Sequence, residues 1–92
     1  IYVTENGISD AKDDRRDTWI KRYIYSLDKA ISEGVDVRGF FYWSLMDNFE
    51  WNMGYAQKFG LYEVNLKNFE RKLRPGAQYF VDVINQTYCA VQ

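Results

Sequence analysis

The sequence predicts an α/β chain in which two strands alternate with two helices, in the order β–α–β–α. Two apolar, strand-forming stretches, Ile1–Thr4 and Phe40–Trp43, flank a segment with helical spacing of apolar residues, Thr18–Glu33. Consecutive strand–helix units favour parallel strands joined by right-handed crossovers. Both strands should then end at the same edge of a sheet, where α/β proteins place their binding sites.

The first strand leads directly into a turn. Ile1, Tyr2 and Val3 are strand formers, and Asn6-Gly7 is a strong turn signal. Glu5 therefore sits where the strand ends and its loop begins. In parallel α/β folds that position carries catalytic side chains, so Glu5 is the first candidate site residue.

A loop dense in Asp, Lys and Arg, from Ser9 to Asp17, precedes the helix. We interpret it as a solvated loop rather than as a metal site. Its acidic residues suit the positive end of a helix dipole, so Asp13, Asp14 or Asp17 is expected to cap the next helix.

The first helix is predicted over Thr18–Glu33, with Gly34 as its stop. Its apolar positions form one stripe that should be buried, and we expect Trp19 to be a core anchor rather than a ligand contact. The stripe consists of Trp19, Ile20, Tyr23, Ile24, Leu27, Ala30 and Ile31.

The stretch Phe40–Trp51, FFYWSLMDNFEW, changes character along its length. Its apolar, aromatic start is typical of a strand buried on both faces. Polar and aromatic side chains then follow, namely Ser44, Asp47, Asn48, Glu50 and Trp51. This change marks the second candidate site.

The chemistry of that mixture points to a sugar. A pyranose has a face of C–H groups that stacks on an aromatic ring and a rim of hydroxyls that needs hydrogen-bond partners. Trp43 can supply the platform, Glu50 the acceptor and Trp51 an indole N–H donor. The alternative from the residues alone is that the aromatic run is core and that Glu50 is a solvated loop carboxylate.

The last third of the chain predicts a hairpin and a helix. Residues 52 to 58 form a loop, Phe59–Val64 is a short strand, and a turn at Lys67-Asn68 leads back along Glu70–Leu73. Pro75 is placed as the first residue of the final helix. The expected buried stripe of that helix consists of Ala77, Phe80, Val81, Ile84 and Tyr88.

Composition excludes several classes of function. The chain has 92 residues, 47% of them hydrophobic, and a net charge of −1, so no nucleic acid or anionic membrane partner is expected. No apolar run approaches the ~20 residues that cross a bilayer. With no histidine and a lone Cys89, we expect neither a histidine-based metal site nor a cofactor. The sequence gives no cellular address, although a cytoplasmic one is preferred.

Three motifs carry a resemblance to a known family. TENG, then WSLMDNFEW, then GYAQKFGL resemble in order and separation the C-terminal part of a glycoside hydrolase family 1 β-glycosidase, from Ile1 to about Tyr88. The resemblance implies a (β/α)8 TIM barrel, which needs about 250 residues. The chain would supply the last two units, about a quarter, as one segment over residues 1–92. Lys58 replaces a usual Arg, and Asn65 stands where Asp is frequent.

The resemblance also implies residue roles. Glu5 would be the nucleophile of a retaining hydrolase, Trp43 the ring-stacking platform, and Phe59 a further wall of the same subsite. Glu50 and Trp51 would bind sugar hydroxyls. The family's acid/base lies on an earlier strand, in an Asn-Glu-Pro context that this chain lacks. Pairing Glu5 with Glu50 as the two catalytic carboxyls is therefore rejected.

Two functional classes remain open. The favoured one is the C-terminal part of an enzyme that hydrolyses β-glucosides or β-galactosides, active only with the missing strands. The rival is a non-catalytic sugar-binding or receptor-like relative, or an isolated barrel fragment without turnover. The expected partners are a β-linked glycoside and either the rest of a barrel or further copies of this chain.

Overall fold

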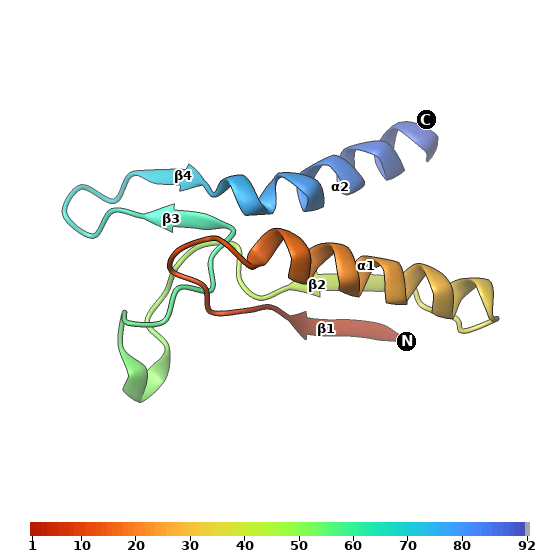
Figure 1. The fold of residues 1–92 in the computed structure, drawn as a ribbon, viewed down its shortest axis with the longest axis horizontal. Coiled ribbons are helices and arrows are strands. Elements are labelled where there is room, and N and C mark those ends of the chain that lie inside the picture. Colours follow the sequence, from red (N-terminus) through yellow and green to blue (C-terminus); the bar gives the residue numbers. More distant parts are fainter. Residues whose placement is uncertain (92) are drawn as a thin grey trace.

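The computed structural model describes the backbone of residues 1–91 and the side chains of residues 1–86. The elements follow one another as a strand–helix–strand unit, a hairpin and a final helix (Figure 1). Their bounds are β1 Tyr2–Asn6, α1 Arg16–Ser32, β2 Gly39–Tyr42, β3 Tyr62–Val64, β4 Arg71–Leu73 and α2 Gln78–Val91, with short 3₁₀ turns η1 Trp51–Met53 and η2 Pro75–Ala77. The predicted hairpin, β3 with β4, lies between β2 and the last helix.

Strands β1 and β2 pair in parallel, as the sequence predicts. Tyr2 lies opposite Gly39 and Val3 opposite Phe40. Because the strands are parallel, their carboxyl ends lie at the same end of the molecule (Figure 1). The loops that follow Asn6 and Tyr42 therefore start side by side.

Helix α1 begins at Arg16, and its cap differs from the prediction. The Oδ2 atom of Asp10 accepts the backbone N–H groups of Arg15 at 2.8 Å and Arg16 at 2.9 Å. The prediction of Asp13, Asp14 or Asp17 as the cap is wrong, because the loop folds back and brings the more distant Asp10 onto the helix end.

Asp13 stabilises the start of the other helical segment instead. Its Oδ2 atom accepts the backbone N–H of Gly76 at 2.8 Å, in the turn η2 that leads into α2. At the opposite end of α1, Gly34 has a φ of 98°, as expected for a glycine that ends a helix.

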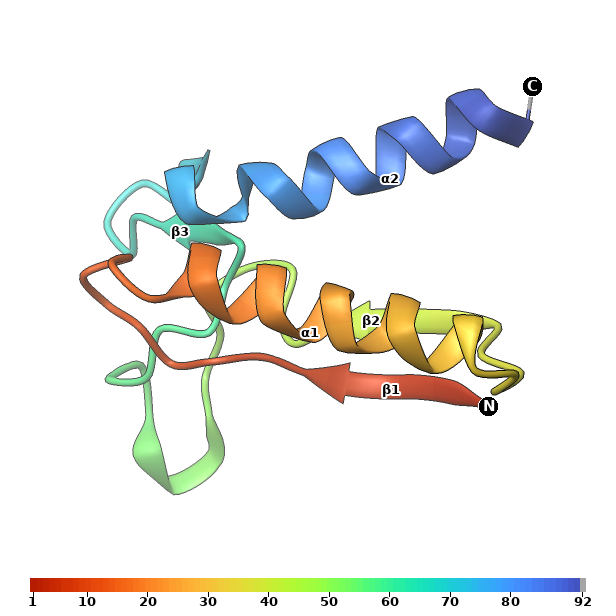
Figure 2. The same cartoon turned by 45° about the vertical axis from the view of Figure 1, so that its right-hand side comes forward.

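The core lies where α1, α2 and the hairpin meet. Ile20, Leu61 and Ala77 are buried, and half-buried apolar side chains surround them. These are Ile24, Tyr42, Tyr62, Leu73, Tyr79 and Phe80. Figure 2 shows α1 between α2 and β1, so both helices cover one side of the short sheet.

Strand β2 is covered on one face only, so the prediction of a strand buried on both faces is wrong. The rings of Phe40 and Tyr42 lie 6.1 Å and 5.9 Å from the ring of Phe80 on α2. Phe41 points the opposite way along the pleat and is 57% exposed. The sheet consequently leaves an apolar face open to solvent.

The predicted helix stripes are buried only in part. Tyr23, Ile31 and Ile84 are exposed, because the described chain packs against a limited length of each helix. The predicted contact of Tyr88 lies outside the described side chains. No helix within residues 1–91 has the length and apolar character needed to span a membrane.

The predicted hairpin is confirmed. Strands β3 and β4 are antiparallel, with Tyr62 opposite Leu73 and Val64 opposite Arg71. Pro75 opens η2, which continues directly into α2 (Figure 2). The helical segment thus starts at the predicted residue as a 3₁₀ turn, and α2 itself begins at Gln78.

Candidate active site

A cavity of about 420 Å³ opens at the carboxyl ends of β1 and β2. Segments far apart in the sequence line it: the end of β1, the first turns of α1, the end of β2 with its loop, and the chain before β3. The lining residues are Glu5, Asn6, Gly7, Trp19, Trp43, Glu50 and Phe59. Four of the five predicted site residues, Glu5, Trp43, Glu50 and Phe59, are among them.

Asn6 and Gly7 bring Glu5 close to Trp43. The backbone N–H of Trp43 donates to the carbonyl of Asn6 at 2.9 Å. A Cβ atom on Gly7 would lie 1.9 Å from the carbonyl oxygen of Trp43, so only glycine fits there. Sequence reasoning interpreted this pair as a turn and missed its second role, the close approach of the two strand ends.

Trp43 and Glu50 form a direct polar contact. The indole Nε1 of Trp43 donates to Oε1 of Glu50 at 2.7 Å. The peptide bond from Trp43 to Ser44 is cis. The hydrogen bond leaves Glu50 with further acceptor lone pairs for a ligand hydroxyl.

Trp19 lines the cavity, so its prediction as a core anchor is wrong. Its indole Nε1 donates to Oδ1 of Asn6 at 3.0 Å, and its ring packs on Tyr23 at 4.8 Å. Trp19 lies in the first turn of α1, next to the end of β1, so its side chain lies at the cavity, whereas the neighbouring Ile20 is buried in the core.

The structure separates Trp51 from the other predicted site residues. Trp51 opens η1, is 84% exposed and does not line the cavity. Its predicted contact with a sugar hydroxyl therefore remains a prediction.

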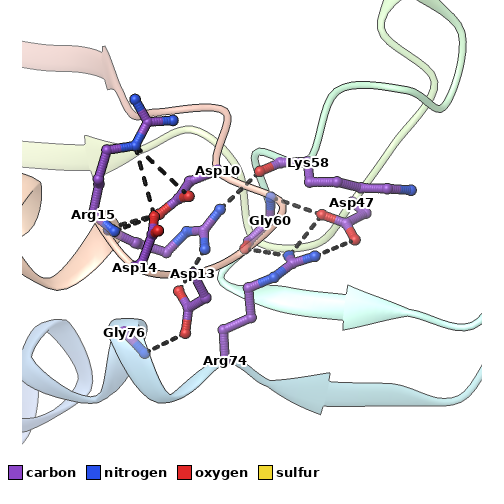
Figure 3. A network of polar contacts seen from close by, with 10 residues as sticks. Asp10, Asp13, Asp14, Arg15, Asp47, Lys58, Gly60, Arg74 and Gly76 are labelled. Carbon is purple, nitrogen blue, oxygen red and sulfur yellow. Dashed lines mark hydrogen bonds and ion pairs between the residues drawn. The ribbon is translucent and has the colours of Figure 1, made fainter.

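A buried ion pair behind the cavity was not predicted from the sequence. Arg74 contacts both carboxylate oxygens of Asp47, at 2.8 Å and 2.9 Å (Figure 3). Burial alone would raise the pKa of Asp47, but hydrogen bonds from Arg74 and from the backbone N–H of Gly60 leave that pKa below its ordinary value. Burial likewise opposes the charge of Arg74, yet Asp47 raises the pKa of the guanidinium overall.

A second buried arginine lies on the other side of Phe59. Arg16 donates through Nη2 to the carbonyl of Lys58 at 2.7 Å and also contacts the carboxylate of Asp13. Burial raises the pKa of Asp10 by itself, but hydrogen bonds from the backbone N–H groups at the start of α1 outweigh this and lower it. Both networks appear in Figure 3.

The described residues contain no group of three His, Cys, Asp or Glu side chains arranged to hold a metal ion. The lining of the cavity offers two carboxylates, indole and phenyl rings, and amide groups.

The profile of Glycosyl hydrolase family 1 matches residues 1–88. The chain belongs to this family. A β-galactosidase of Pyrococcus woesei is 52% identical over 71 residues, covering 77% of this chain and 14% of the relative. A probable inactive β-glucosidase 14 of Oryza sativa subsp. japonica is 48% identical over 81 residues, covering 76% of this chain and 16% of that protein.

Solved structures agree with the family assignment. A β-glycosidase from Pyrococcus horikoshii superposes with a TM-score of 0.80 at 49% identity, covering 83% of this chain and 18% of that one. The structural neighbours are family 1 β-glucosidases and have the TIM-barrel fold. The chain spans 14% to 17% of the length of the first curated relatives.

Proposed function

We propose that this chain is the C-terminal part of a retaining β-glycosidase that hydrolyses β-glucosides or β-galactosides. One observation carries the proposal: Glu5, Trp43, Glu50 and Phe59 line one cavity at the carboxyl ends of two parallel strands. The last two βα units of a TIM barrel would present their active-site face at this edge.

The chemistry assigns different work to the two carboxylates. Retention requires a carboxylate that attacks the anomeric carbon and a second group that protonates the leaving oxygen. Glu5, at the end of β1, is the nucleophile in this proposal. Glu50 already accepts a hydrogen bond from Trp43, which suits an acceptor of sugar hydroxyls better than a proton donor. The acid/base is then supplied by another part of the barrel.

The aromatic residues complete a half-subsite. Trp43 and Phe59 line the cavity from two different segments, and a pyranose can stack its C–H face on the Trp43 ring. Trp51 is the proposed donor to a further hydroxyl. It opens the turn η1, directly after Glu50.

A non-catalytic relative is the second candidate. The similarity to a protein named as a probable inactive β-glucosidase shows that high identity over this segment does not by itself separate active from inactive members. The intact Glu5 favours the enzyme, because a binding protein has no need of a nucleophile at that edge.

The test uses a host barrel, defined as a full-length active relative in which residues 1–88 of this chain replace the matching segment. The host barrel should hydrolyse an aryl β-glycoside, and Glu5→Gln should remove almost all turnover while substrate binding stays close to intact. The amide is nearly isosteric but cannot attack the anomeric carbon. A Glu5→Gln host barrel that kept about a tenth of the rate would contradict the assignment.

A further inference from the structure

Phe59 stands between two residues whose backbone groups are held by buried arginines. The carbonyl of Lys58 accepts from Nη2 of Arg16 at 2.7 Å and from the backbone N–H of Asp10 at 3.0 Å. The backbone N–H of Lys58 donates to Oγ of Ser9 at 3.1 Å. The chain entering Phe59 is therefore fixed to the loop before α1.

The chain leaving Phe59 is fixed by the pair of Asp47 and Arg74. Gly60 donates its N–H to Oδ1 of Asp47 at 3.0 Å, and its carbonyl accepts from Nη1 of Arg74 at 2.8 Å (Figure 3). Both side chains are buried, with 4% and 6% of their surface exposed. A single ion pair thus satisfies both backbone groups of Gly60.

Asp47 also belongs to the segment from Trp43 to Glu50, which forms the opposite wall of the cavity. Asp47 lies four residues after Trp43 and three before Glu50, and its own N–H donates to the carbonyl of Tyr62 at 3.1 Å. A Cβ atom on Gly60 would lie 2.3 Å from the backbone nitrogen of Asp47. The two wall segments therefore meet backbone to backbone at Gly60.

The two walls also exchange backbone hydrogen bonds on the Trp43 side of that contact. The N–H of Ser44 donates to the carbonyl of Phe59 at 3.2 Å, and the carbonyl of Ser44 accepts from the N–H of Leu61 at 2.9 Å. The separation between the Phe59 ring and the Trp43 ring is thus determined by how these two segments are held together.

We propose that Asp47 and Arg74 are positioning residues of the sugar site, which fix Phe59 at the distance from Trp43 and Glu50 that a pyranose requires. The inference rests on the proposed function and deepens it. A buried ion pair contributes little net stability, since its desolvation offsets the attraction of the charges. Its bidentate geometry, however, fixes the relative orientation of the two side chains as well as their distance. The wall of a binding site needs both to be fixed.

The test measures sugar affinity in the host barrel for Asp47→Asn, Arg74→Lys and the double variant. For each single variant, KM for the aryl glycoside and the inhibition constant of the released monosaccharide should both rise about tenfold. The double variant should be little worse than either single one, because both changes break the same pair.

The control is Ile24→Ala, which removes a half-buried apolar side chain that packs against the core. Ile24 lies in the middle of α1 and does not line the cavity. All variants are assayed well below the lowest Tm of the set. The control should lose stability, yet its KM and inhibition constant should stay within about twofold of the unaltered host barrel.

Every result of these assays either supports or contradicts the positioning role of Asp47 and Arg74. If Asp47→Asn and Arg74→Lys bind sugar as the unaltered host barrel does, or if Ile24→Ala weakens binding equally, the positioning role is wrong and the proposed function stands. If Glu5→Gln keeps its turnover, the proposed function fails and this inference with it. Should Asp47→Asn not fold, Arg74→Lys keeps the positive charge, loses the two-pronged contact and carries the same expectation.

Discussion

Trp43 contacts three other residues of the candidate active site. Its indole donates to Glu50, its backbone N–H donates to Asn6, and its carbonyl lies against Gly7. Because backbone and side chain are both held, the ring has a fixed orientation at the cavity. A fixed ring loses little conformational entropy when a ligand stacks on it.

Removing the Trp43 ring should therefore lower the affinity for a monosaccharide. In the host barrel, Trp43→Ala is expected to weaken monosaccharide binding by about 1–3 kcal/mol, by analogy with aromatic platforms that stack bases. Titration calorimetry with the monosaccharide measures this change in binding free energy. Phe41→Ala, in β2 two positions before Trp43 and outside the cavity lining, is the matched control. Equal losses for both variants would mean a general effect on β2 instead of a platform.

Glu50 should affect catalysis as well as binding. Hydrogen bonds to sugar hydroxyls strengthen as the ring flattens in the transition state, so Glu50→Gln is expected to lower kcat and raise KM. Steady-state kinetics of the host barrel on an aryl glycoside separate the two parameters. A variant with altered KM and unchanged kcat would leave Glu50 a binder of the ground state alone.

At the scale of elements, the start of α1 depends on Asp10. Its buried carboxylate accepts two backbone N–H groups, so Asp10→Ala should lower the stability of the host barrel by about 1–2 kcal/mol. The exposed Asp14 is the matched control, and Asp14→Ala should change stability by no more than about 0.5 kcal/mol. Thermal unfolding of both variants gives the comparison.

The pH dependence of that stability has a defined sign. The pKa of Asp10 is lowered in the folded state, so its contribution is complete above the unfolded pKa of 3.8 and is lost as pH falls through the folded pKa. The gap in Tm between the unaltered host barrel and Asp10→Ala should therefore narrow below about pH 4. A gap that stayed constant down to pH 2 would contradict the cap's ionised state.

The sequence predicted elements well wherever a local pattern defined them. The helical spacing after residue 17 gave α1, Gly34 ended it, and the turn at Lys67-Asn68 gave the hairpin. Glu5 and Trp43 could be placed together because parallel strands end at one edge. Such features depend on neighbours in the sequence.

Contacts between distant residues could not be predicted in this way. Asp47 and Arg74 are 27 residues apart, and nothing in either local pattern indicates their pairing. A local pattern predicts the nearest acidic residues as the cap of α1. The path of the loop brings Asp10 to the helix instead, and that path depends on the hydrogen bond from the N–H of Asp10 to the carbonyl of Lys58. Burial of Phe41 was overestimated because the chain covers a single face of β2.

At the scale of the whole molecule, the chain is an elongated body of 45 × 29 × 21 Å with an incomplete sheet. Among residues 1–91, β1 and β2 have one neighbouring strand each, namely the other. Each therefore presents an edge of unpaired backbone groups beside an apolar face. Such edges pair readily with another chain.

We accordingly expect this chain alone to be neither an efficient hydrolase nor a monomer. Without a general acid the leaving group departs unassisted, at a cost of about 10²–10⁴-fold in rate. Light scattering should show association with further copies or with a complementary barrel fragment. Steady turnover of an unactivated disaccharide by a verified monomer of 11.0 kDa would contradict both expectations.

The most direct test of the account is covalent trapping of the nucleophile. With a 2-deoxy-2-fluoro glycoside that has an activated leaving group, the glycosyl ester on the nucleophile forms faster than it is hydrolysed. The sugar label therefore stays on the attacking carboxylate. Digestion and mass spectrometry of the labelled host barrel should locate the added sugar on Glu5, with the anomeric carbon joined to a carboxylate oxygen. A label on Glu50, or turnover of the aryl glycoside with Glu5 unlabelled, would contradict the account.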